Sequence, residues 1–326
     1  MTAAAASPVR WGIMGTANIA RGQFLPGMRR AGGTAEAVGS RDARTAERYA
    51  AEHGIARALT GYQSLIDDPD VDALYIALPN SLHADWTIAA LQVGKPVLCE
   101  KPLTGNLSDT QRVLDVARQT GTLLWEAFVF PFHDQMARVR ATLGSGVIGE
   151  LREIHSDFHF KVTRPDNIRL FADFAGGALN DVGCYPIRLA FELFGRAHQS
   201  AWGSCVPGGH GIDLESTAVL GYGDGRNLVL SCGMNRRYDT FTRLLCSDGE
   251  IRLSNPFHPS DGDRLEILGR ETETTDAAPH AEPSFTAAIR HIQAVLCGVE
   301  EPRQLAIDTS QPTAQALHDL HAQLGL

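Results

Sequence analysis

The sequence predicts an α/β fold: an N-terminal doubly wound parallel sheet, followed by a C-terminal α/β domain with an open, mostly antiparallel sheet. Two observations lead to this fold class. Apolar strands alternate with helical patterns over the first third of the chain, and a period-two alternation follows Gly149. The chain of 326 residues also exceeds the roughly 100–200 residues of one domain, so we predict two, residues 1–124 and 125–326.

In the first domain each strand is predicted from an apolar run, and each helix from a period near 3.6 residues. The regular alternation of the two patterns indicates that the strands are parallel. The predicted strands are 9–14, 35–39, 73–78, 97–100 and 123–126, and the helical patterns include 62–68, 83–93 and 108–119.

In the second domain short strands are joined by turns that contain glycine and aspartate, which indicates an antiparallel sheet. A large apolar sheet face must be covered, so we expect a homodimer or homotetramer that associates through this sheet. Helices at 285–297 and 313–324 are expected to return to the first domain, and 272–283 to form a loosely ordered linker. The predicted strands are 151–162, 216–222, 228–232, 240–246 and 250–253.

Composition and charge exclude several classes of protein. The formal net charge is −9 and lysine and arginine form no stripe, which argues against a nucleic-acid surface. No apolar stretch reaches about 18 residues, and residues 1–8 lack the pattern of a signal peptide, so we expect neither membrane insertion nor secretion. The six cysteines lack a C-x-x-C spacing, so we expect a reducing cytoplasm, no disulfides and no metal site.

The first strand leads into a turn, residues 15–20, and then a helix, which is the layout of a dinucleotide-binding motif. The usual fingerprint has three glycines, but here Ala17 and Ala20 occupy the later places. An ordinary βα turn is therefore the alternative. The expected cofactor contacts in this turn are Gly15, Thr16, Ala17, Asn18 and Ile19.

The end of the next strand predicts which cofactor binds. Ser40 stands where an NAD enzyme carries an acid for the ribose 2′-hydroxyl, and Arg41 follows it. A hydroxyl and a planar cation suit a 2′-phosphate, which a carboxylate would repel. We therefore predict NADP(H) over NAD(H). The alternative is that Arg41 is an ordinary solvated side chain.

Many short motifs then occur in the order that is typical of one enzyme family. These motifs are residues 15–20, Ser40-Arg41, Leu78-Pro79-Asn80 with His83, Gly94-Lys95-Pro96, Glu100-Lys101-Pro102, Glu126-Ala127-Phe128 and residues 176–185. With them the chain resembles, over most of its length, the glucose–fructose oxidoreductase, inositol dehydrogenase and rhizopine-catabolism (Gfo/Idh/MocA) family.

The resemblance implies a Rossmann domain that binds the cofactor, then a domain that binds substrate and pairs between subunits. It also implies that several strand-end residues line the nicotinamide ring and its ribose, and that Pro102 follows a cis peptide bond. For His83, a helix-start residue that packs on the sheet is the alternative. The implied cofactor-lining residues are Leu78, Pro79, Asn80, His83, Glu100 and Lys101.

Two departures from the family pattern bear on activity. Many members carry a proton-transferring histidine where this chain has Tyr185. This change resembles the branch of dihydrodiol and xylose dehydrogenases and of the sugar 3-ketoreductases. Pro131 also stands where many relatives have an arginine, so a function that depends on that arginine is weakened.

The expected catalytic residues are Lys101, Tyr185 and Asp181. Reduction of a ketone needs a proton donor at the carbonyl oxygen, and we assign this role to Tyr185. The ammonium of Lys101 would lower the pKa of that phenol. The alternatives are a surface lysine and a core tyrosine. Asp181 either caps the helix 185–194 or, as the resemblance implies, binds a substrate hydroxyl.

The predicted function is that of an NADP(H)-dependent oxidoreductase of the EC 1.1.1 type. It transfers hydride between nicotinamide and a secondary alcohol or ketone of a sugar, with a nucleotide-linked ketosugar as the preferred substrate. A dehydrogenase of a free aldose or cyclic trans-diol is one alternative, and a noncatalytic NADP-binding regulator is another. A nucleotide sugar needs arginines that converge on its diphosphate. The candidates are Arg164, Arg169, Arg236, Arg237 and Arg243.

Overall fold

The computed structural model describes residues 8–260, 262–270, 273–277 and 282–326. The chain forms two compact units, and it enters the first one a second time near its C-terminus. Unit 1 consists of Met1–Thr104, Gln111–Ala127 and Phe285–Asp308, and unit 2 consists of Gly105–Thr110, Phe128–Ser284 and Thr309–Leu326.

Unit 1 is built around a six-stranded parallel sheet with the order β3-β2-β1-β4-β5-β6. The order reverses between β1 and β4, as it does in a doubly wound fold, so the predicted parallel sheet is confirmed. The sequence did not predict β3, because its four residues are only partly buried and form no apolar run. The strands are β1 (Arg10–Met14), β2 (Thr34–Ser40), β3 (Arg57–Thr60), β4 (Ala73–Ile76), β5 (Val97–Cys99) and β6 (Leu124–Glu126).

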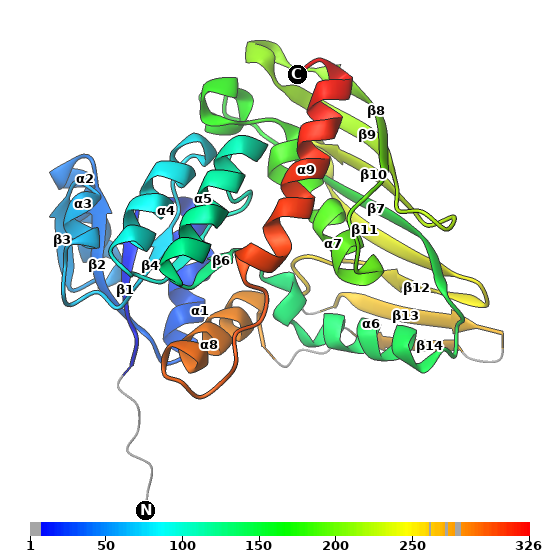
Figure 1. Ribbon diagram of the computed structural model, residues 1–326, viewed down its shortest axis with the longest axis horizontal. Coiled ribbons are helices and arrows are strands. Elements are labelled where there is room, and N and C mark those ends of the chain that lie inside the picture. Colours follow the sequence, from blue (N-terminus) through cyan, green and yellow to red (C-terminus); the bar gives the residue numbers. More distant parts are fainter. Residues whose placement is uncertain (1–7, 261, 271–272, 278–281) are drawn as a thin grey trace, which may run out of the picture. The chain divides into compact units, whose positions relative to one another are not determined.

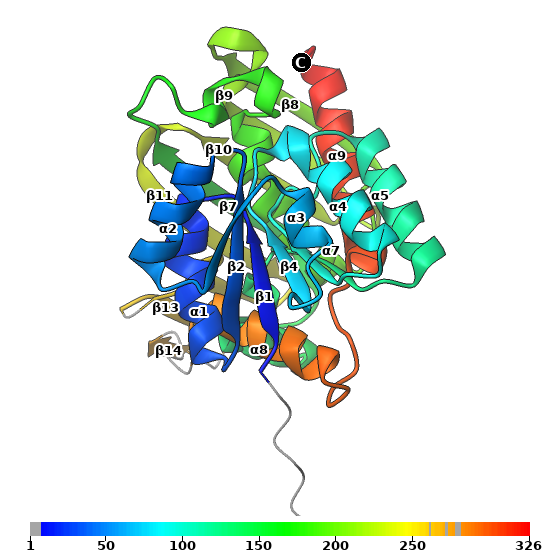
Figure 2. The same cartoon turned by 90° about the vertical axis from the view of Figure 1, so that its left-hand side faces the viewer.

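Helices cover both faces of this sheet, as Figure 2 shows. One group, α3, α4 and α5, packs on the face that carries Met14, Ile76 and Cys99. On the opposite face, Phe24 stacks on Tyr75 with 3.8 Å between ring centroids. The helices are α1 (Leu25–Arg30), α2 (Ala43–His53), α3 (Gln63–Ile66), α4 (His83–Gln92), α5 (Leu107–Thr120) and α8 (Ser284–Leu296).

Unit 2 contains an eight-stranded sheet with the order β14-β13-β12-β11-β7-β10-β9-β8. Its neighbouring strands are antiparallel except β7 and β10, which run parallel, so the expected mostly antiparallel sheet is confirmed. The strands are β7 (Leu151–Lys161), β8 (Ser200–Pro207), β9 (Asp213–Gly221), β10 (Asn227–Gly233), β11 (Asn235–Cys246), β12 (Gly249–Leu253), β13 (Arg264–Gly269) and β14 (Glu273–Ala277).

One face of the second sheet is covered by α7 (Cys184–Phe194) and α9 (Ala306–Leu324), which lie against it in Figure 1. The core there joins Phe158 and Leu244 of the sheet to Leu189 and Leu320 of these helices. A third helix of this unit is α6 (Asp134–Ser145). Because side chains alternate along a strand, the residues between the core positions point to the other face.

The segment 272–283, expected to be a linker, differs in part from that expectation. Residues 273–277 form β14, which pairs with β13 as an antiparallel edge strand. Its polar residues show no apolar alternation, so only the pairing with β13 identifies it as a strand. Residues 272 and 278–281 lie outside the described part of the chain. Within the described part, no helix combines the length and apolar character needed to span a membrane.

Candidate functional site

The turn after β1 requires glycine at position 15. Gly15 has a φ of +99°, and a Cβ atom there would lie 2.8 Å from the carbonyl oxygen of Ala77. Its backbone N–H donates to the carbonyl of Gly39 over 2.9 Å. Because β1 and β4 flank the point where the strand order reverses, the turn lies where doubly wound folds bind their ligands.

Alanine fits the two later positions of this motif. Ala20 is fully buried at the start of a π-helical turn, Ala20–Phe24, that leads into α1. Its single methyl group therefore still permits close packing of helix on strand. Thr16 and Ala17 remain partly accessible, and Asn18 is exposed. The backbone of this turn is therefore within reach of a ligand, while a side chain at Gly15 would meet the backbone of Ala77.

At the end of β2, where the sequence predicts the choice of cofactor, the side chains have defined contacts. Ser40 is buried and Arg41 is exposed, and the guanidinium of Arg41 interacts with the hydroxyl of Tyr62. Burial raises the pKa of Tyr62, so this phenol stays protonated. The nearby carboxylate of Asp42 accepts the N–H of Thr45 over 2.8 Å and caps α2. Asp42 therefore serves the helix, while Arg41 offers positive charge at the strand end.

Buried side chains contact the backbone of the loop that carries Lys101. The ring nitrogens of His83 lie 3.0 Å from the carbonyl oxygen of Pro102 and 2.9 Å from that of Leu78. The N–H of Leu103 donates to Glu126 over 2.7 Å. The peptide bond between Lys101 and Pro102 is cis, as expected. The carbonyl oxygens of Pro102 and Leu78 thus face the two nitrogens of one fully buried imidazole, which bonds one of them when the ring is neutral.

His83 is buried, which fits the alternative of a helix-start residue that packs on the sheet. The structure does not show His83 in contact with a cofactor. The residue is 0 % exposed, and burial lowers its pKa. The ring is therefore neutral and donates through one nitrogen only. Its observed contacts are with two backbone loops, so a direct contact with nicotinamide stays a prediction.

Glu100 is fixed by a residue that the sequence did not single out. The hydroxyl of Tyr75 donates to Oε1 of Glu100 over 2.5 Å, and Tyr75 is fully buried in β4. Burial, and then the charge of Glu100, raises the pKa of Tyr75 well above its usual range. The phenol therefore remains a donor. A hydroxyl within an otherwise apolar strand is the signal that would have identified it.

One of the two roles predicted for Asp181 was to cap a helix, but in unit 2 it does not occupy the cap position of α7. It lies inside a π-helical turn, Leu179–Gly183, that precedes α7. Its Oδ2 accepts a hydrogen bond from Nε of Arg169 over 2.7 Å. The N–H of Leu179 is instead capped by the buried carboxylate of Asp213 in β9, over 2.9 Å. Only the folded chain brings Asp213 to this helix, so sequence spacing could not identify it as the acceptor for Leu179.

Tyr185 follows Asp181 by one helical turn and is held in an aromatic cluster. Only 6 % of Tyr185 is exposed. Its ring centroid lies 5.3 Å from that of Phe128, 5.1 Å from Phe257 and 5.4 Å from His258. The contacts with Phe128 and His258 are edge-to-face and that with Phe257 is tilted, and together they fix the ring before any substrate binds.

The arginines expected to bind a diphosphate are mostly paired with carboxylates. Arg164 pairs with Asp166, Arg169 with Asp181, Arg236 with Glu215 and Arg243 with Glu250. Arg243 also neighbours the core residue Leu244, so it points to the opposite face of the sheet. This arrangement weakens the expectation that these side chains converge on one diphosphate.

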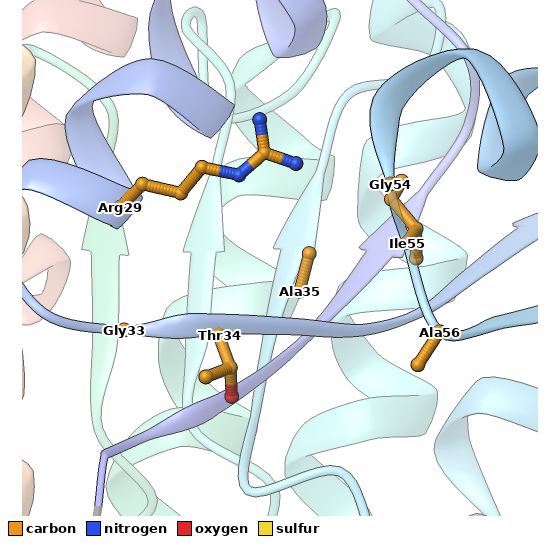
Figure 3. Close-up of a pocket in the computed structure, with 7 residues that line it drawn as sticks. All are labelled: Arg29, Gly33, Thr34, Ala35, Gly54, Ile55 and Ala56. Carbon is orange, nitrogen blue, oxygen red and sulfur yellow. The ribbon is translucent and has the colours of Figure 1, made fainter.

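Other features do not add to the site. Among the described residues, no group of three histidine, cysteine or acidic side chains is arranged to hold a metal ion. A hollow in unit 1 is lined by Arg29, residues 33–35 and residues 54–56 (Figure 3). It lies at the amino ends of β2 and β3, and the guanidinium of Arg29 there donates to the carbonyl of His53. Ligands of doubly wound folds bind at the other end of the strands.

Comparison with known proteins identifies the family. Residues 9–128 match the model of an oxidoreductase family with an NAD-binding Rossmann fold, and residues 136–252 match the GFO/IDH/MocA C-terminal domain. The chain belongs to the Gfo/Idh/MocA oxidoreductase family. The predicted family, fold class and enzyme class are therefore confirmed.

Several relatives of this family member are named sugar enzymes. A dTDP-3,4-didehydro-2,6-dideoxy-α-D-glucose 3-reductase of Streptomyces violaceoruber is 38% identical, over 86% of this chain and 83% of that protein. D-xylose 1-dehydrogenase (NADP(+)) 2 of Haloferax volcanii is 34% identical, over 87% and 89%. The crystal structure of KijD10, a 3-ketoreductase from Actinomadura kijaniata in complex with NADP and TDP-benzene, matches with a TM-score of 0.87 and 30% identity, over 97% and 98%. The predicted NADP-dependent sugar oxidoreductase agrees with these names.

Proposed function

We propose that this protein is an NADP(H)-dependent oxidoreductase that reduces a keto group of a nucleotide-linked deoxysugar. The observation that carries the proposal is the similarity, over most of both chains, to sugar 3-reductases, one of them solved with NADP and a TDP compound. The retained Lys101, Asp181 and Tyr185 support catalysis, because a regulator that only bound the cofactor would need none of these groups at a reacting carbon.

The cofactor, when bound, supplies or accepts hydride at C4 of its nicotinamide ring. In the proposed reduction, the hydroxyl of Tyr185 transfers its proton to the substrate oxygen as negative charge develops there. Lys101 provides positive charge that stabilises the negative charge developing on the substrate oxygen. Asp181, as a carboxylate, accepts a hydrogen bond from a sugar hydroxyl and orients the ring. A ketone plus hydride and proton gives the secondary alcohol.

NADP(H) is the proposed cofactor. The glycine turn at Gly15 lies between β1 and the following helix, where a pyrophosphate binds in doubly wound folds, and Arg41 at the end of β2 supplies a cation for a 2′-phosphate. The proposed cofactor-contacting residues remain those of the turn, the end of β2 and the loops after β4 and β5.

Oxidation of a free aldose is a second candidate, and two observations favour it. One relative is a D-xylose 1-dehydrogenase, and four candidate phosphate-binding arginines are paired with carboxylates. A sugar without phosphate groups would not need those arginines.

One assay distinguishes the two candidates. The purified protein is given NADPH with dTDP-3,4-didehydro-2,6-dideoxy-α-D-glucose and, separately, NADP⁺ with D-xylose, and absorbance is followed at the reduced-nicotinamide band. We expect turnover of the ketosugar. Turnover of D-xylose alone would replace the proposed substrate class by the second candidate.

The control is Tyr185→Phe, which removes the proton donor and is expected to lower kcat by about 10²- to 10⁴-fold with the Kd for NADPH unchanged.

We also propose that the protein forms a homodimer or homotetramer through the eight-stranded sheet. Trp202 and Val206 on β8 support this, because they are 60 % and 51 % exposed. The molar mass in solution, measured by light scattering, tests it against the mass of a monomer.

The six cysteines are all free thiols, which supports a reducing cytoplasmic location.

A further inference from the structure

Arg169 is tied to Asp181 by its side chain. Its Nε donates to Oδ2 of Asp181 over 2.7 Å. The guanidinium side chain is 42% exposed and the carboxylate only 12%. A charge-assisted bond of this length to a nearly buried carboxylate is stronger than an ordinary surface pair, because removing the cation would leave a desolvated anion.

The backbone of Arg169 is tied to the same segment. Its carbonyl accepts the N–H of Gly177 over 2.9 Å. A Cβ atom on Gly176 would lie 2.3 Å from that carbonyl oxygen, so the close approach depends on glycine. Asn167 in turn accepts the N–H of Arg169 over 3.1 Å. The loop and the helical turn that carries Asp181 are therefore locked together at several points.

We infer that Arg169 is a positioning residue for the reaction and acts through Asp181. It holds one oxygen of the carboxylate in place, so that Asp181 accepts a hydrogen bond from the sugar. The inference rests on the proposed function of Asp181. In this role Arg169 is not a diphosphate ligand, because its guanidinium binds a carboxylate of the same chain.

A double-mutant cycle tests this inference. The variants are Arg169→Gln, Asp181→Asn and the double variant, assayed with whichever of the two substrates the wild-type protein turns over. We expect each single variant to lower kcat/KM by about 10- to 100-fold, as expected for loss of a charged hydrogen bond. The double variant should be no worse than Asp181→Asn alone, with the same division between kcat and KM. Losses that multiply in the double variant would overturn the inference.

The matched control is Arg140→Gln. Nη2 of Arg140 pairs with Glu192 over 3.1 Å, with side-chain exposures of 38% and 7%, so a similar pair is broken away from Asp181. We expect normal kcat/KM for this control. Arg169→Lys keeps the charge and should recover part of the activity. If Arg169→Gln does not fold, as judged by its melting curve, the cycle uses Arg169→Met, which also removes the charge.

Binding of dTDP separates the positioning role from phosphate binding. If Arg169 acts through Asp181, the Kd for dTDP stays within about twofold in Arg169→Gln. A rise of tenfold or more, with Asp181→Asn unaffected, would overturn the inference and make Arg169 a phosphate ligand. Wild-type protein that turns over only D-xylose would instead contradict the proposed nucleotide-linked substrate, and the cycle with D-xylose would still test Arg169.

Discussion

Single residues around one loop show how the fold supports the side chain that we propose to act in catalysis. Lys101 extends from a loop whose neighbouring backbone groups are held by His83 and Glu126, while Tyr75 fixes the adjacent Glu100. All three supporting side chains are buried. Such support is what keeps a reacting group in a productive geometry, so Lys101 gains positional precision from residues that need not touch the cofactor.

Gly15→Ala should destabilise unit 1 and weaken cofactor binding. The φ of +99° is unfavourable for alanine, and the new Cβ would lie 2.8 Å from the carbonyl oxygen of Ala77. We expect a loss of about 1–3 kcal/mol in the free energy of unfolding and a higher Kd for NADPH. Gly22→Ala is the control, because a Cβ there meets nothing within 4 Å. Equal stability of the two variants in urea would contradict this account of the turn.

Arg41→Ala should remove the preference for NADPH. Its cation lies at the end of β2, while the neighbouring carboxylate of Asp42 is engaged in capping α2. We expect the Kd for NADPH, from a fluorescence titration, to rise by about tenfold or more, which is the scale of a phosphate contact. The Kd for NADH is the internal control and should stay the same. A parallel change in both constants would mean that Arg41 does not recognise the 2′-phosphate.

At the scale of elements, both segments predicted to carry chemistry contain a π-helical turn. One follows the Gly15 turn at Ala20–Phe24, and the other carries Asp181 at Leu179–Gly183. Such turns are rare and occur frequently at functional sites, because an extra residue in the helix shifts the direction of the side chains that follow. In unit 2 the shifted helix is then anchored to the sheet by Asp213.

Asp213→Asn tests that anchor. The carboxylate accepts from Leu179 N–H and, over 2.7 Å, from the hydroxyl of Ser216, and it is buried. An amide oxygen is a weaker acceptor, so we expect a loss of about 1–3 kcal/mol in the free energy of unfolding and a lower kcat. The Kd for NADPH should not change, because the cofactor-binding segments lie in unit 1. Ser216→Ala, which leaves the bond to Leu179, should cost less.

At the scale of the whole molecule, buried histidines predict how stability depends on pH. Burial lowers the pKa of His83, His159 and His321 below the usual 6.5. Their folded forms stay neutral while the unfolded chain binds protons, so stability is present above pH 6.5 and is lost as pH falls through the folded pKa values. Burial raises the pKa of Asp157, so this one carboxyl adds stability as the pH falls, opposite to the three histidines.

Urea unfolding at pH 7.5 and 5.5 measures this dependence. We expect a smaller free energy of unfolding at pH 5.5. His321→Gln keeps a polar side chain and removes one of the titrating groups, so the difference between the two pH values should shrink in this variant. An unchanged free energy of unfolding across this range in the wild-type protein would contradict the assignment of neutral buried histidines.

The sequence by itself determined the parallel sheet, most strands of both units and the family. Apolar runs and glycine turns are local signals, and motifs such as Glu100-Lys101-Pro102 keep their order along the chain. The sequence did not predict β3, β8, β13 or β14. β3 is only partly buried and β14 is polar, so neither has an apolar run to mark it.

Only the tertiary structure decided which side chains act on each other. Asp213 caps a helix that begins 34 residues earlier, Tyr75 reaches Glu100 across 25 residues, and Arg169 meets Asp181 across 12. The sequence offered Asp181 as one possible helix cap, but a buried N–H is satisfied by whichever acceptor the packed sheet brings to it. Local pattern thus fixes where elements form, and packing fixes the partners of their polar groups.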